Sequence, residues 1–230
     1  MLHCFFSGEG ANAVAESLPS CTLLSGPSRS GKTSLLFQLA YNTCGKSDTA
    51  TVVFICKRQN VERKPPVLSE DVDADSEVFG RVQMKYVKGD DEVRRYFAAF
   101  HLHEKIPTTV IIDDLVDLFD ELESRECYRQ ARGWEIGIVR TLALCRDAMN
   151  YASQIAGVDC KLIISDTNIN QGPRLLYIYQ RWFTLILTVE SIGSSFVLKV
   201  FQDSRCIPAC KGILAQYTVS QQFLRLEMLR

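Results

Sequence analysis

Short apolar runs alternate along the chain with longer stretches whose apolar residues recur at helical spacing. Runs rich in Val, Ile and Leu predict buried strands, and the 3.6-residue repeats predict amphipathic helices. Asp90 is the predicted N-cap of the second helix. The predicted strands are Cys21–Leu24, Thr51–Cys56, Arg81–Val87, Thr109–Ile112 and Lys161–Ser165, and the predicted helices cover residues 34–40, 90–102 and 131–156.

The C-terminal part of the sequence has a different pattern, without helical intervals. Two apolar runs, Trp182–Val189 and Ser195–Phe201, are separated by the turn-forming stretch Ser191–Ser194, which predicts an antiparallel hairpin. Tyr217–Val219 and Phe223–Leu226 predict a second, shorter hairpin. These strands would extend one edge of the sheet.

Strands that alternate with helices and are apolar almost throughout indicate a parallel sheet covered on both faces. The expected fold is therefore an α/β domain over residues 1–230, with a central, mainly parallel sheet, helices on both faces and antiparallel C-terminal edge strands. The segment Gln59–Gly80 contains Lys64-Pro65-Pro66 and an acidic run, and we expect it to form an exposed, mobile loop.

Composition narrows the class of protein without identifying it. The 230 residues are 47% hydrophobic, enough for a sizeable core, and the net charge of -1 excludes a strongly basic nucleic-acid-binding tail but not a local basic groove. The nine cysteines form no C-x-x-C pair, which favours reduced thiols. The N-terminal residues lack the pattern of a signal peptide, and no apolar stretch approaches the length of a membrane span.

The stretch Gly26–Thr33 fits the phosphate-binding pattern G-x-x-x-x-G-K-[ST], and it lies between a predicted strand and a predicted helix. Glycines let the backbone approach a phosphate closely, and the amides of the loop and of the helix N-terminus are directed at it. Lys32 would reach the β- and γ-phosphates, and Thr33 would bind Mg²⁺. The predicted cofactor-binding residues are Gly26, Pro27, Ser28, Arg29, Ser30, Gly31, Lys32 and Thr33.

An acidic residue at the end of a neighbouring strand should complete the metal site, and Asp113 follows the run Thr109–Ile112. Asp114 comes next, but adjacent side chains of a strand point in opposite directions, so we assign only Asp113 to Mg²⁺. Asp114 could polarise an attacking water, which makes Lys32 and Asp114 the candidate catalytic residues, or it could be a solvated turn residue. The sequence lacks the guanine-reading motif Asn/Thr-Lys-x-Asp, so the expected nucleotide is ATP.

These motifs together resemble the RecA-type recombinases and their paralogues. The resemblance covers roughly residues 18–225 and includes Gly26–Thr33, Asp113, the strand Lys161–Ser165 with its polar tip, and Val200–Pro208. It implies a RecA-like ATPase core that binds ATP and Mg²⁺.

Among these proteins, the chain is most similar to the small paralogues that act with SWIM-type zinc-finger proteins in Shu-type complexes. The shared features are Cys56-Lys57-Arg58, Val82–Tyr86, the following helix and a short N-terminal region. The resemblance implies a nuclear protein of homologous recombination repair. It also implies single-stranded DNA, a SWIM-type zinc-finger protein and other recombinase-family proteins as partners, in a hetero-oligomer.

One departure from the family weakens the expected hydrolysis. Recombinases have a catalytic glutamate just after the second strand, where this chain has Lys57 and Arg58, and a cation cannot act as a base. Glu62 could bend back, or Asp114 could substitute. Arg58 could contact the γ-phosphate or be a solvated residue at the strand end. We therefore expect a weak ATPase.

Two stretches combine cations with aromatic residues, as single-stranded nucleic acid requires. One is the expected loop Asn168–Arg181, which follows a strand whose polar end senses the γ-phosphate in the family. The other is Arg125–Trp134. Alternatively, their aromatic residues belong to the core and their cations to a solvated helix face. The candidate DNA-contacting residues are Arg129, Arg132, Arg174, Tyr177 and Arg181.

Two other functions remain open at this point. The missing glutamate allows a catalytically inactive P-loop scaffold that acts only through protein–protein interaction. The P-loop alone also allows a small-molecule or nucleotide kinase, although the long interval from Lys32 to Asp113 and the strand-rich C-terminal part favour the recombinase-like interpretation.

Overall fold

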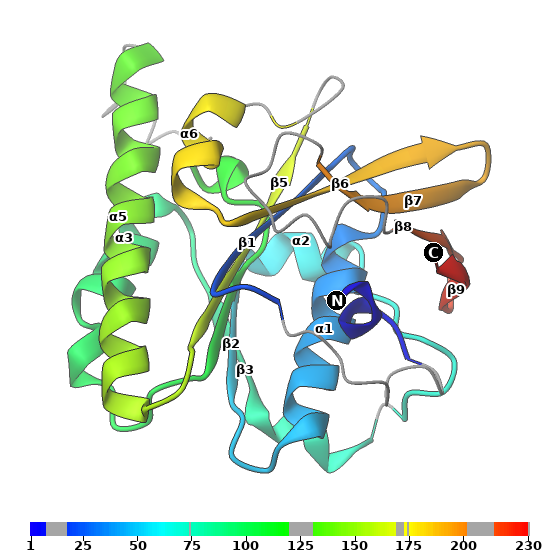
Figure 1. Cartoon of the computed structure of the whole chain (residues 1–230), viewed down its shortest axis with the longest axis horizontal. Coiled ribbons are helices and arrows are strands. Elements are labelled where there is room, and N and C mark those ends of the chain that lie inside the picture. Colours follow the sequence, from blue (N-terminus) through cyan, green and yellow to red (C-terminus); the bar gives the residue numbers. More distant parts are fainter. Residues whose placement is uncertain are drawn as a thin grey trace.

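A nine-stranded mixed sheet forms the centre of the molecule (Figure 1). The computed structural model describes residues 1–7, 18–73, 75–119, 131–168, 173, 175–201 and 214–229, with only the backbone of residues 131 and 132. The strand order is β3-β2-β4-β5-β1-β6-β7-β8-β9. The strands are β1 (Cys21–Gly26), β2 (Val52–Cys56), β3 (Val82–Tyr86), β4 (Thr109–Ile112), β5 (Lys161–Thr167), β6 (Leu185–Ile192), β7 (Ser195–Val200), β8 (Leu214–Val219) and β9 (Leu224–Leu229).

The sheet is parallel from β3 to β6 and antiparallel from β6 to β9. This confirms the predicted α/β fold with a mainly parallel core and antiparallel C-terminal strands. The helices are α1 (Lys32–Lys46), α2 (Arg58–Arg63), α3 (Asp90–Ala98), α5 (Ala131–Ala156) and α6 (Leu176–Trp182), with short 3₁₀ helices at Leu2–Phe5, Glu77–Arg81, Phe100–Leu102 and Val116–Phe119.

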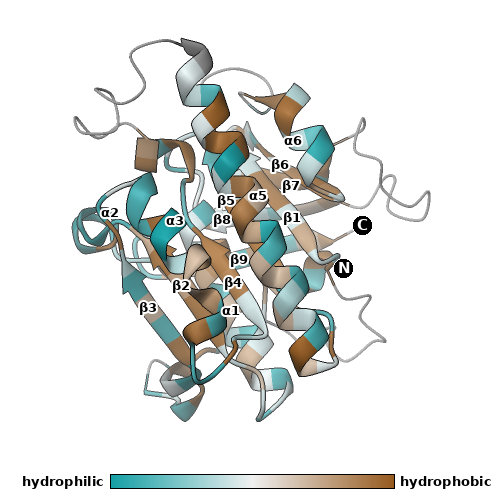
Figure 2. Cartoon of the chain, turned by 90° about the vertical axis from the view of Figure 1, so that its left-hand side faces the viewer, coloured by the Kyte–Doolittle hydropathy of each residue, from teal (hydrophilic) through white to brown (hydrophobic). Residues whose placement is uncertain are grey.

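The strands are apolar almost throughout because each face of the sheet has its own core. In β2, Val53 and Ile55 belong to the core beneath α3 and α5, whereas Val52, Phe54 and Cys56 belong to the core beneath α1. This alternation follows from the two-residue period of a strand. Figure 1 shows α1 on one side of the sheet with α3 and α5 on the other, and Figure 2 looks onto the face that α3 and α5 cover.

Three local predictions were wrong. The segment predicted to begin a strand at Trp182 is the end of α6, and β6 begins only at Leu185. The expected loop Asn168–Arg181 therefore contains a helix, whose Ile178 and Tyr179 are buried in the core beside α5. The N-cap of α3 is Gly89 rather than Asp90, since Asp90 is the first helical residue and pairs with Arg94.

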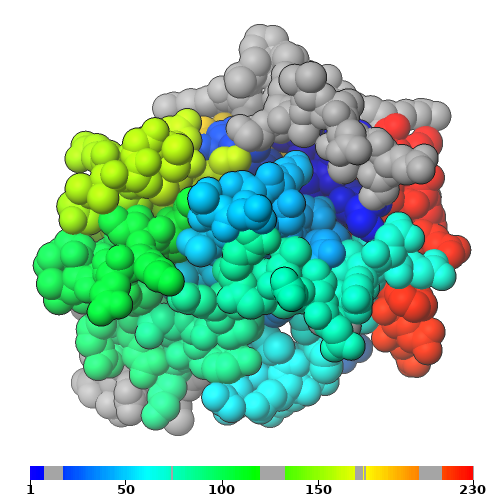
Figure 3. Space-filling model, turned by 90° about the horizontal axis from the view of Figure 1, so that it is seen from below, coloured from blue at the N-terminus to red at the C-terminus, as the bar shows by residue number. Residues whose placement is uncertain are grey.

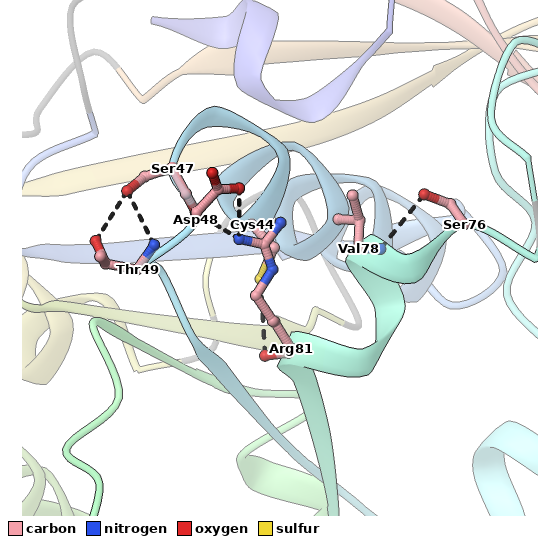
Figure 4. A network of polar contacts seen from close by, with 7 residues as sticks. All are labelled: Cys44, Ser47, Asp48, Thr49, Ser76, Val78 and Arg81. Carbon is pink, nitrogen blue, oxygen red and sulfur yellow. Dashed lines mark hydrogen bonds and ion pairs between the residues drawn. The ribbon is translucent and has the colours of Figure 1, made fainter.

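The segment 59–80, predicted to be an exposed loop, contains most of α2 and the start of the 3₁₀ helix Glu77–Arg81. Arg81, which ends that 3₁₀ helix, ties it to the end of α1. Its guanidinium donates to the Ser47 carbonyl at 2.9 Å and to Asp48 Oδ1 at 3.3 Å, and its carbonyl accepts from Cys44 Sγ at 3.7 Å (Figure 4). These three contacts fix this end of the segment against the C-terminal end of α1.

The glycine-rich loop between β1 and α1 fits tightly against the C-terminal strands. Gly31, the N-cap of α1, has φ 81, in the left-handed region that favours glycine. A Cβ atom at this position would lie 2.6 Å from Cγ2 of Val219 in β8. The loop conformation therefore depends on glycine for two reasons, backbone torsion and space.

We predict that Gly31→Ala destabilises the fold more than Gly157→Ala does. Gly157 also has positive φ, at 66, but a Cβ there meets nothing within 4 Å. Both variants should lose about 1–2 kcal/mol to the left-handed backbone, and Gly31→Ala should lose a further ~1–3 kcal/mol to the clash with Val219. Urea unfolding of the two variants measures the difference, and equal losses would show that β8 yields to the added methyl group.

Candidate phosphate-binding site

Lys32 lies at the first position of α1, and its side chain turns back over the loop that precedes it. Its Nζ donates to the carbonyl of Gly26 at 3.1 Å and to that of Pro27 at 2.9 Å. The residue is only 7% exposed. Its ammonium group is thus held within the ring of the loop, where a bound phosphate would replace backbone carbonyls as its partner.

Strands β6 and β8 hold the loop from behind. Tyr217 of β8 is fully buried, and its hydroxyl donates to the Ser30 carbonyl at 2.8 Å. A Cβ on Gly26 would lie 2.7 Å from Cβ of Val189 in β6. Burial raises the pKa of Tyr217, so that its hydroxyl keeps the proton that it donates. The loop shape is therefore fixed by the sheet as well as by its own glycines.

The side chains of Thr33 and Asp113, predicted together as a metal site, lie in contact. Thr33 Oγ1 donates to Asp113 Oδ2 at 2.8 Å, and Ser165 Oγ donates to Asp113 Oδ1 at 2.6 Å. This arrangement follows from the strand order, because β5 lies between β1 and β4 and places Ser165 between the loop and the acid. A hydroxyl and a carboxylate side by side are ligands that Mg²⁺ prefers.

Asp114 takes part in the same cluster by a different route. Its backbone has φ 54, and its amide donates to Ser165 Oγ at 2.8 Å. Its carboxylate accepts from the hydroxyl of Thr167 at 2.8 Å and from the Thr167 amide at 3.3 Å. Asp114 therefore ties the end of β4 to the end of β5, and it also lines the pocket described below. Neither description of Asp114 given by the sequence, water-polarising base or solvated turn residue, includes this bracing contact.

The two cations that follow β2 are engaged with other groups. Lys57 Nζ donates to the Asp117 carbonyl at 2.7 Å and pairs with Asp117 Oδ2 at 3.2 Å. Arg58 lies over the ring of Tyr86, 4.5 Å from its centroid, and pairs with Glu62 at 3.6 Å. Glu62 thus points to Arg58, and neither Arg58 nor Glu62 lines the pocket.

A pocket of about 310 Å³ opens above the loop. Part of its lining is formed by residues of the loop with Asp113 and Asp114, and part by residues that follow β2 and β4 and were not among the predicted site residues. These are Asn60, Arg63, Lys64, Pro65, Pro66 and Asp117. Lys64-Pro65-Pro66 was noted in the sequence only as part of an expected exposed, mobile loop, and nothing local placed it at this pocket.

The pocket balances buried charges of both signs. Burial is the main reason why the pKa of Lys32 is lowered, and the charges of Asp114, Asp113 and Asp166 oppose this effect. The positive charge of Lys64 lowers the pKa of Lys32 further, because the two ammonium groups repel each other. Burial likewise raises the pKa of Asp113 and Asp114, against the effect of their hydrogen bonds.

The candidate DNA-contacting residues divide between described and undescribed parts of the chain. Arg129 and Arg174 lie outside the described residues, as does the side chain of Arg132. Tyr177 and Arg181 lie together on α6 and line a groove of about 470 Å³ between α5 and α6. The other residues of this groove are Glu135, Ile136, Val139, Arg140, Arg146, Ile178 and Trp182.

The groove residues differ in how far they belong to the core. Tyr177 is 54% exposed, whereas Trp182 packs partly against the core beneath α5. A hydrogen bond with Glu135 raises the pKa of Tyr177. Tyr177 and Arg181 are therefore an exposed aromatic residue and an exposed cation on the same short helix, and Trp182 lines the groove as a partly buried residue.

No family model matches this sequence, and neither does any curated protein.

In the parts of the chain that the structure describes, no helix combines the length and hydrophobicity needed to cross a membrane. The chemistry of the loop, of Asp113 and Asp114 and of the groove between α5 and α6 is the basis for the function proposed below.

We predict that Asp113→Asn stabilises the ligand-free protein at neutral pH. The raised pKa means that the folded state disfavours the charged carboxylate, so the cost is full above the folded pKa and disappears as pH falls from that pKa towards the ordinary value of 3.8. The gain from the amide should shrink over the same interval. Urea unfolding at a series of pH values measures it, with the exposed Asp71→Asn as control; a variant less stable than wild type at neutral pH would contradict the prediction.

Proposed function

We propose that the chain is a RecA-like, ATP-binding recombinase paralogue that hydrolyses ATP weakly. The observation that carries the proposal is the contact between Thr33 and Asp113 beside the inward-turned Lys32. In such a site the loop amides and Lys32 hold the phosphates, and Thr33 and Asp113 hold Mg²⁺, which neutralises charge on the phosphates. A chance G-x-x-x-x-G-K-[ST] sequence would not require a buried acid from a distant strand at this position.

Slow hydrolysis follows from the chemistry around the pocket. Lys57 and Arg58 cannot accept a proton, and Glu62 pairs with Arg58 away from the pocket. Asp114 is the remaining candidate base, but two of its acceptor positions are used by Thr167. The site thus supports tight binding of ATP better than rapid turnover, as expected of a switch.

The groove between α5 and α6 supports single-stranded DNA as the second ligand. Tyr177 offers a ring on which a base could stack, and Arg140, Arg146 and Arg181 outnumber Glu135 along the same groove. In line with the family resemblance, we propose that the chain acts in homologous recombination repair in the nucleus. Its partners there would be a SWIM-type zinc-finger protein and other recombinase-family proteins, in a hetero-oligomer.

A catalytically inactive scaffold is the second candidate. It is favoured by the way Lys32 satisfies its ammonium group on the carbonyls of Gly26 and Pro27, since the loop then keeps its shape without a phosphate. In that case nucleotide would be unnecessary for partner binding.

We predict that the purified chain, alone or with its partner, binds Mg²⁺–ATP and that Lys32→Ala weakens this binding by at least about tenfold, because a charge-assisted contact is lost. ATP turnover should be slow, rise with single-stranded DNA and fall further in Asp114→Asn. Calorimetry and phosphate release measure the two effects. Lys88→Ala, on an exposed residue outside the pocket, is the control, and a wild-type protein that binds no ATP would leave only the scaffold.

We also predict that Tyr177→Ala weakens binding to an unstructured oligonucleotide by about tenfold, because stacking contributes ~1–3 kcal/mol per base. Tyr151→Ala removes an exposed tyrosine of α5 that does not line the groove, and it should leave affinity unchanged. Fluorescence anisotropy measures both. Equal affinities of the two variants would place the DNA elsewhere on the molecule.

A further inference from the structure

Residues 64–70, here called the strap, follow α2, and the first three of them, Lys64, Pro65 and Pro66, line the phosphate pocket. The strap is fastened to α1 by two backbone amides: that of Val67 donates to Ser34 Oγ at 3.1 Å, and that of Ser69 donates to Gln38 Oε1 at 2.9 Å. Gln38 is fully buried, so its Oε1 needs a hydrogen-bond donor from the protein, and the amide of Ser69 is that donor. The strap is therefore a positioned element.

A second pair of contacts fastens the strap to the C-terminal edge of the sheet. The carbonyl of Leu68 accepts from the amide of Leu224 at 2.9 Å, and Glu70 pairs with Arg225 at 3.1 Å. Figure 3 shows the cyan-to-teal surface, which includes this segment, against the red C-terminal strands. Pro65 and Pro66 restrict the backbone that leads from these anchors back to α2.

The strap and the end of α2 bring two uncommitted cations to the pocket. Arg63 and Lys64 both line it, and both have exposed side chains. Neither has an acidic partner within salt-bridge distance among the described residues, whereas Lys57 pairs with Asp117 and Arg58 with Glu62. Two free cations on the wall of a pocket that already contains a phosphate-binding lysine favour a ligand with more negative charge than Lys32 alone can balance.

The cations of the pocket come from two different parts of the chain. Lys32 is held at the inner end by the carbonyls of Gly26 and Pro27, where the loop would enclose a β-phosphate. Arg63 and Lys64 line the same pocket as Lys32, Thr33 and Asp113, but they come from the end of α2 and the start of the strap. A terminal phosphate that extends into the pocket beyond the loop would therefore enter a space that these two cations also line.

We propose that Arg63 and Lys64 form a second phosphate-binding arm that contacts the terminal phosphate of a nucleoside triphosphate and makes the site prefer triphosphate over diphosphate. The proposal rests on the nucleotide-binding function proposed above and adds the residues that distinguish the two nucleotides. The arm belongs to the same chain as the loop, so this preference needs no residue from a neighbouring subunit.

The test compares Mg²⁺–ATP with Mg²⁺–ADP in an Arg63→Ala/Lys64→Ala double variant. Affinity for ATP should fall by about tenfold or more, and affinity for ADP by less than about twofold, because only ATP has a phosphate that reaches the arm. Displacement of a fluorescent ADP analogue from the purified chain or its complex measures both affinities. The control is Arg58→Ala/Lys88→Ala, which removes two exposed cations outside the pocket and should change neither affinity.

A charge-conserving variant separates contact from structure. Arg63→Lys/Lys64→Arg should keep the preference for ATP if the charges act on the phosphate. Equal losses for ATP and ADP in the alanine variant would mean that the strap only supports the fold, and unchanged affinities would mean that the arm does not reach the ligand; either result overturns the proposal. Failure of the wild-type chain to bind either nucleotide would instead refute the proposed function itself, and the arm with it.

Discussion

The buried carboxylate of Asp113 is the group on which the arrangement of the site depends. An unpartnered charge in this position would be costly, and the hydroxyls of Thr33 and Ser165 satisfy one oxygen each. Those two residues come from α1 and β5, so the requirement to satisfy one acid fixes the relative positions of three elements. The parallel register of β1, β5 and β4 supplies that fit, because each strand ends at the same edge of the sheet.

Much of this could be predicted from the sequence because it depends on local patterns. The alternation of apolar runs with helical repeats correctly predicted a mainly parallel sheet between helices. The spacing of the residues in Gly26–Thr33 predicted the glycine-rich loop. The pairing of Thr33 with Asp113 was also predictable, since acids at strand ends collect beside a phosphate-binding loop. The strand predicted to begin at Trp182 was placed too early, because the aromatic residues Trp182 and Phe183 suit a strand as well as the end of a buried helix.

The residues that sequence reasoning missed are those placed by tertiary contacts. Nothing near Arg63 and Lys64 indicates that Ser34 and Gln38 of α1 would draw the following residues across the pocket. Asp117 was overlooked for the same reason, because its partner Lys57 comes from another strand end. Charged and polar residues on an irregular segment show no periodic pattern that would predict where they lie. Their positions depend on which buried hydrogen-bond acceptors of the folded chain need a donor.

The hydroxyl of Tyr217 has a consequence for the order in which the molecule becomes functional. It holds the carbonyl of Ser30 from 187 positions further along the chain. A nascent chain can therefore form the glycine-rich loop early in synthesis but cannot brace it until β8 has emerged and paired. The long sequence separation of this contact also places it among the slow, late steps of folding. A ribosome stalled before Tyr217 would present the whole glycine-rich sequence Gly26–Thr33 without the support that gives the loop its shape.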